Sequence, residues 1–151
     1  MLLNVIDKVI RKPYIAFFIS GVIPLILGFK AQGVIDINIH DTYYVISRRH
    51  LTILYSIAFG LIGFSYFIAE KVRVNLSYNL NLIHLIITFG GINMVLILNH
   101  LMLENSEIDT IAKLNFSQNL YVMIYFIIIG VVIGQIILPI NIIRGISKTT
   151  E

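Results

Sequence analysis

Four long apolar segments dominate the sequence and limit the environments in which it can fold. Hydrophobic residues make up 58% of the 151 residues, charged residues make up only 13%, and cysteine is absent. A water-soluble domain cannot bury that much apolar surface, whereas each helical crossing of a bilayer needs about 20 such residues. We therefore predict an all-α polytopic membrane protein with a single membrane domain, residues 1–151. Its four transmembrane helices are expected near residues 13–35, 42–69, 79–103 and 119–143.

Basic residues lie between the apolar segments and at the chain ends, so they indicate topology. One predicted side carries Lys8, Arg11, Lys12, Lys71, Arg73, Arg144 and Lys148. The opposite side carries Lys30 and Lys113, with Arg48 and Arg49 at a helix mouth, together with most of the acidic residues. The positive-inside rule then predicts cytoplasmic termini. The net charge of only +3 argues against a nucleic-acid partner.

The polar run DINIHDTYYV, Asp36 to Val45, lies between the first two apolar segments. It resembles the segment that enters the tenth helix of subunit I of haem–copper terminal oxidases, the family that includes cytochrome c oxidase. The resemblance continues in the same order: residues 56–64 resemble the body of the tenth helix, and residues 83–84, 89–94 and 99–101 resemble the eleventh. The resemblance covers roughly residues 20–135, about the last third of a twelve-helix subunit. It implies the fold of helices nine to twelve and a role in respiratory electron transport.

The resemblance assigns haem chemistry to the start of the second span. In the family, two histidines one residue apart follow the Tyr-Tyr-Val run; the first binds the high-spin haem and the second the low-spin haem. Arg48 and His50 occupy these positions here. An arginine stays protonated and cannot ligate iron. The family's copper ligands lie on helices that have no counterpart in this sequence. The resemblance therefore implies one haem at most, bound through His50 and framed by Tyr43 and Tyr44, with no copper and no oxygen reduction by this chain alone.

Each of these residues also has a structural interpretation. Arg48, Arg49 and His50 can form the interfacial collar of a helix whose apolar part starts at Leu51. His40 and Asp41 resemble part of the family's magnesium site, but we favour a hydrogen-bonded turn at a helix start, with Asp41 as the N-cap. Tyr43 and Tyr44 also fit an interfacial aromatic belt.

Polar residues within the apolar segments are expected to hold helices together. His84 and His100 are too far apart on one helix to share a metal, about 24 Å, so we expect each to hydrogen-bond across helices, as do Asn93 and Asn99. Gln135 and Pro139 indicate packing and a kink. The GxxxG spacing of Gly130 and Gly134 favours packing within the chain over a dimer face.

Three functions remain open from the sequence, and no catalytic residue is assigned in any of them. The first is a respiratory electron-transport component that binds one haem through His50. The second is a haem-free structural or assembly subunit of a membrane respiratory complex. The third, half of a split subunit I, is disfavoured by Arg48. Expected partners are membrane lipid and either other respiratory-chain subunits or a second copy of the chain. A bacterial inner membrane is favoured over a mitochondrial one.

Overall fold

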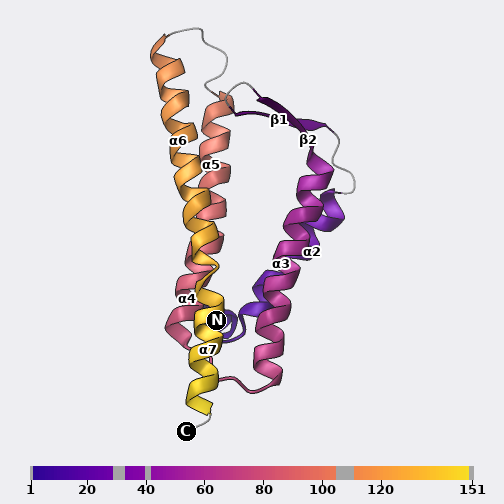
Figure 1. Ribbon diagram of the computed structural model, residues 1–151, viewed down its shortest axis with the longest axis vertical. Coiled ribbons are helices and arrows are strands. Elements are labelled where there is room, and N and C mark those ends of the chain that lie inside the picture. Colours follow the sequence, from indigo (N-terminus) through magenta and orange to yellow (C-terminus); the bar gives the residue numbers. More distant parts are fainter. Residues whose placement is uncertain (1, 29–32, 40–41, 105–110, 150–151) are drawn as a thin grey trace. The chain divides into compact units, whose positions relative to one another are not determined.

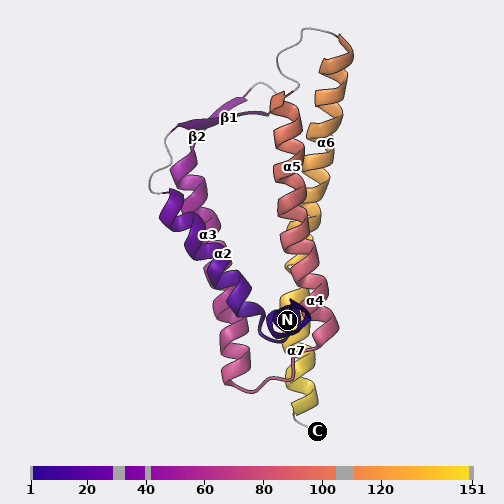
Figure 2. The ribbon, with the colours of Figure 1, turned by 180° about the vertical axis from the view of Figure 1, so that it is seen from behind.

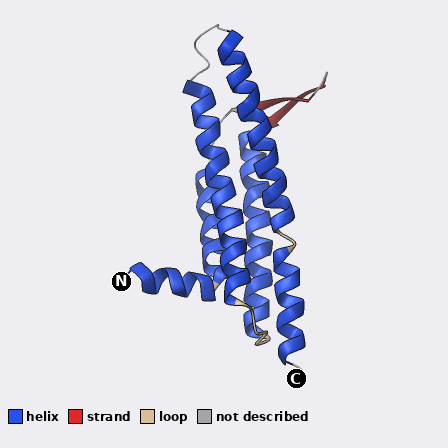
Figure 3. Cartoon of the chain, turned by 90° about the vertical axis from the view of Figure 1, so that its left-hand side faces the viewer, coloured by secondary structure: helices blue, strands red, loops and turns tan. Residues whose placement is uncertain are grey.

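A computed structural model describes residues 2–28, 33–39, 42–104 and 111–149. Most of these residues are helical, with a single two-stranded hairpin (Figure 3). The chain divides into two compact units, Met1–Arg73 and Val74–Glu151, each described by itself below. The mainly helical structure agrees with the predicted fold class. The hairpin was not part of the all-α prediction. The prediction of a single domain stays a prediction.

Three helical stretches are long and apolar enough to cross a bilayer: Arg48–Lys71, Tyr78–Leu98 and Asn119–Lys148. A fourth crossing results if Asn4–Arg11 and Pro13–Ile26, which meet at 91°, are counted as one broken span. The predicted number of four is thus reached only with this bent pair. The bend follows from the sequence, because a proline disfavours helical geometry in the residue before it and is itself well suited to a first helical position. Lys12 accordingly separates the two helices.

The first unit contains α1 (Leu2–Arg11), α2 (Pro13–Gly28), β1 (Val34–Ile39), β2 (Thr42–Ser47) and α3 (Arg48–Lys71) (Figure 1). α2 and α3 lie side by side in both face views (Figures 1 and 2). Phe17 is fully buried between them, stacked on Tyr66 with ring centroids 5.8 Å apart and tilted against Phe59 at 5.6 Å. Gly63 makes room for this packing, since a Cβ there would lie 3.1 Å from the Phe18 ring.

The hairpin replaces helix at two places in the expected spans. β1 and β2 pair antiparallel, with Val34 opposite Ser47 and Ile39 opposite Thr42. The reason is visible in the sequence: residues 35–39 alternate isoleucine with polar residues, and residues 42–46 are rich in β-branched and aromatic types. The second span therefore starts at Arg48, not near residue 42. The first ends as helix at Gly28.

The second unit contains α4 (Tyr78–Leu85), a π-helical turn η1 (Ile86–Gly90), α5 (Gly91–Glu104), α6 (Ile111–Gly134) and α7 (Ile137–Thr149). α4, η1 and α5 follow one another without interruption, and α6 and α7 are separated by a turn at residues 135–136. The predicted kink is confirmed, because Pro139 has no N–H to donate to the Gln135 carbonyl. Leu138 donates to that carbonyl instead, at 3.3 Å.

Glycines allow the two spans of the second unit to pack closely. A Cβ added at Gly91 would collide with Val131, and one added at Gly134 would lie 2.6 Å from the Ile87 side chain. By contrast, a Cβ at Gly130 would meet no described atom within 4 Å. Of the predicted GxxxG pair, Gly134 therefore packs within the chain and Gly130 does not.

Candidate functional site

His50 lies in the first turn of α3 and is exposed. The hairpin positions this turn, because the Arg48 N–H donates to the Gly33 carbonyl at 3.2 Å, and Gly33 has the positive φ of 102° that glycine tolerates. The Arg48 carbonyl in turn accepts a hydrogen bond from the Thr52 hydroxyl at 2.9 Å. The predicted ligand therefore stands at the junction of hairpin and helix with its imidazole accessible from outside the chain.

The other predicted site residues belong to the hairpin. Tyr44 lies in β2 opposite Ile37 and is 48% exposed. The backbone of Tyr43 pairs with Asn38. His40 and Asp41 lie outside the described residues, so the magnesium-site interpretation stays a prediction. The capping interpretation of Asp41 needs correction, because the strand β2 intervenes and the residue that precedes α3 is Ser47.

A low-spin haem would need two axial ligands, and the described part of the chain offers one accessible imidazole, that of His50. His84 is fully buried in the other unit and already hydrogen-bonded. No group of three or more His, Cys, Asp or Glu residues suited to a metal ion occurs among the described residues. Haem binding through His50 therefore stays a prediction.

The best-defined polar site among the described residues is a cluster in the second unit, formed by the buried His84 and Thr88 and the partly buried Gln135. The Gln135 side-chain oxygen lies 3.0 Å from His84 Nε2. Its amide nitrogen donates to the Thr88 hydroxyl at 3.1 Å and to the Val131 carbonyl at 2.9 Å. His84 and Thr88 are 0% and 1% exposed. The predicted cross-helix hydrogen bond of His84 is thus confirmed.

Two backbone irregularities meet at this cluster. Thr88 belongs to the π-turn η1, and Gln135 opens the turn between α6 and α7. Irregular backbone within a membrane is tolerated where it is buried in protein, because lipid offers no hydrogen bonds. The Gln135 side chain connects the two irregular places, and so it holds the two spans of this unit in one register.

A second polar cluster lies at the start of α4, where that helix meets α7. Asn141 is fully buried; its amide donates to Asn81 Oδ1 at 2.8 Å, and its Oδ1 accepts from the Ser77 N–H at 2.9 Å. The pair therefore ties α7 to the residue that precedes α4. Asn81, Thr88 and Asn141 all lie within apolar stretches of the sequence. Polar residues inside apolar spans were the available signal, but their pairing was not.

The predicted role of Asn93 is wrong, and two related residues are not described. The Asn93 amide donates to the Phe89 carbonyl on its own helix at 2.7 Å, not across helices. The side chains of Asn99 and His100 lie outside the described residues. In the described part of the chain, no buried side-chain nitrogen or oxygen lacks a hydrogen-bond partner. The buried polar groups are therefore occupied with one another.

No family model matches the chain, and no solved structure matches its fold. The resemblance to oxidase subunit I consequently rests on the sequence motifs alone.

Proposed function

We propose that this chain is a haem-free structural subunit of a membrane respiratory complex, related to the last four helices of oxidase subunit I. One observation carries the proposal: the buried polar side chains of the second unit, His84 and Asn141 above all, are hydrogen-bonded to other side chains of the same unit. Side chains that serve a ligand in a membrane are left open toward a cavity, whereas these join helices. The buried polar side chains that the structure describes are thus suited to fixing the packing of the helices.

The outer faces of both units support a role in assembly. Large apolar side chains are exposed along the spans, among them Leu54 at 64%, Leu61 at 63%, Phe126 at 71% and Val132 at 64%. Such faces are covered in a membrane by lipid or by helices of other subunits. Partner subunits of a respiratory complex, or a second copy of the chain, therefore have apolar surface to contact.

We further propose that the chain resides in a bacterial inner membrane with both termini cytoplasmic. In the first unit, the Lys12 ammonium and the Glu70 carboxylate pair at 2.7 Å, so the start of α2 and the end of α3 share one end. Three more basic residues lie close to this pair in the sequence: Lys8, Arg11 and Lys71. Concentrated basic residues mark the cytoplasmic face.

A second candidate function is that of an electron carrier with one haem on His50. The observation that favours it is the exposure of His50 beside two arginines in the first turn of α3. Arginines are suited to bind carboxylate groups such as haem propionates. In this candidate the second axial ligand comes from a partner subunit or from His50 of a second copy.

The deciding experiment is a reduced-minus-oxidised spectrum with a pyridine haemochrome assay on protein purified in detergent after haem-supplemented expression. The structural proposal expects no stoichiometric haem signal, and co-purification with respiratory-chain subunits from membranes solubilised in mild detergent. A haem signal that is lost in His50→Ala but kept in Lys71→Ala, an exposed residue at the other end of α3, would establish the carrier instead. A colourless chain that isolates without respiratory subunits would contradict both candidates.

A further inference from the structure

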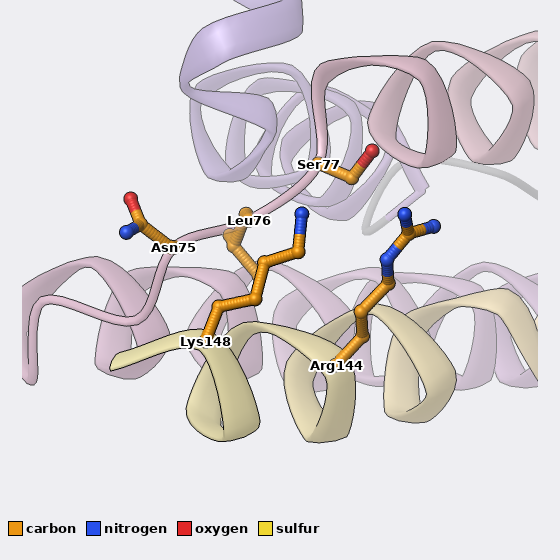
Figure 4. Close-up of a pocket in the computed structure, with 5 residues that line it drawn as sticks. All are labelled: Asn75, Leu76, Ser77, Arg144 and Lys148. Atoms are coloured by element: carbon orange, nitrogen blue, oxygen red, sulfur yellow. The ribbon is translucent and has the colours of Figure 1, made fainter. Parts of the chain in front are cut away.

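A hollow of about 240 Å³ opens in the second unit between the segment that precedes α4 and the last turns of α7. Its lining residues are Asn75, Leu76, Ser77, Arg144 and Lys148. Figure 4 shows the Arg144 guanidinium and the Lys148 ammonium both extending from α7 toward the Leu76–Ser77 segment. The hollow is thus lined by two cations, a hydroxyl and an amide, and by no acidic residue.

The two cations are placed in a way that calls for an anion between them. Arg144 and Lys148 are four residues apart, so they lie on the same face of α7, where two like charges repel. No carboxylate of the described residues forms an ion pair with either of them. An anion in the hollow would turn this repulsion into two attractive contacts. Arginine in addition offers a planar fork of donors that matches a phosphate group.

The opposite wall adds fixed polar groups. Ser77 precedes α4, and its hydroxyl makes no capping hydrogen bond to the first turn of that helix. Its backbone N–H donates to Asn141 Oδ1 at 2.9 Å, which holds the residue against the hollow. The start of a helix carries partial positive charge, because its first N–H groups point outward along the axis. The wall formed by Ser77 therefore favours an anion as well.

The location of the hollow identifies the kind of anion. It lies where the candidate span Tyr78–Leu98 begins and where Asn119–Lys148 ends, which is the level of lipid headgroups. On α7, Ile140 and Ile143 are 52% and 64% exposed and offer apolar surface for acyl chains. Basic pockets at the ends of transmembrane helices are suited to anionic headgroups. We propose that this hollow binds the phosphate group of an anionic phospholipid.

The test uses the full chain in nanodiscs of phosphatidylcholine, with and without phosphatidylglycerol. Because the chain has no tryptophan and no cysteine, helix content by circular dichroism is the readout of thermal unfolding. Phosphatidylglycerol should raise the unfolding midpoint of the natural protein. The double variant Arg144→Gln with Lys148→Gln should lose that rise and show roughly tenfold weaker retention of the lipid in native mass spectrometry. The double variant Lys8→Gln with Lys71→Gln removes the same charge elsewhere and should keep the rise.

A second measurement needs no variant. Amine-reactive labelling of the natural protein should show Lys148 protected by phosphatidylglycerol relative to Lys8. An equal rise in both double variants, or equal labelling of the two lysines, would overturn the site. If inorganic phosphate in detergent gives the same protection as the lipid, the hollow is a site for free phosphate and the lipid assignment is overturned.

Discussion

The apolar helices of the two units are held together by different contacts. In the first, α2 and α3 are joined by aromatic rings and small residues, with Phe17 against Tyr66 at its centre. In the second, side-chain hydrogen bonds of Gln135 and Asn141 also join the spans. Lipid removes most of the hydrophobic force between helices, so that packing and hydrogen bonds remain. The first unit relies on packing, and the second adds side-chain hydrogen bonds to its close glycine contacts.

The largest effect is expected where packing alone is removed. Phe17→Ala deletes a fully buried ring that contacts Phe59 and Tyr66, and should lower the free energy of unfolding by about 2–3 kcal/mol. The estimate lies below the roughly 3–5 kcal/mol typical of a buried phenylalanine in a water-soluble protein, because in lipid the transfer from water contributes little. The measurement is SDS titration in mixed micelles followed by circular dichroism. Phe64→Ala, at 53% exposed on α3, is the control and should change little.

An intermediate effect is expected from breaking the hydrogen bonds of the second unit. Asn141→Leu leaves Asn81 and the Ser77 N–H without their partner and should cost about 1–2 kcal/mol in the same titration. Asn93→Leu is the matched control, because Asn93 is exposed and bonds only to its own helix. Equal losses in the two variants would contradict a special role for the buried pair, and the contrast between the units would then fail.

The smallest effect is expected at the ion pair between Lys12, which precedes α2, and Glu70 of α3. Lys12 and Glu70 are both substantially exposed, and the hydrogen bond and charge of Glu70 raise the pKa of Lys12. Glu70→Gln should lower stability only slightly, and the difference should vanish at high salt because exposed pairs are screened. The measurement is the same titration at two salt concentrations. A loss as large as that of Phe17→Ala would mean that charge, not packing, holds the first unit together.

Some of this structure was predictable from the sequence and some was not, for physical reasons. Apolar length predicted membrane helices, and Pro139 predicted the break at Gln135, since a missing N–H acts locally. The hairpin was missed although residues 35–39 alternate with period two, because the resemblance to a helical family outweighed that pattern. The amphipathic α1 was not predicted at all.

The sequence predicted which polar residues need partners, but not which residues they pair with. A histidine or asparagine within an apolar span must find a partner, and His84 does. Which residue it finds depends on the rotation and offset of two helices, which one sequence does not contain. Asn93 instead finds its partner on its own helix, because its amide donates to the Phe89 carbonyl. Sequence reasoning could name the candidates, and only the packing could pair them.

The π-turn at Ile86–Gly90 sets the angular relation between the two halves of its span. One residue of an α-helix corresponds to about 100° of rotation, and a π-turn accommodates one extra residue. Thr88 lies within the turn and contacts Gln135, and Gly91 follows the turn and approaches Val131. The residues after Gly90 therefore differ in azimuth from the direction that one unbroken α-helix would give them, although the span continues without a break.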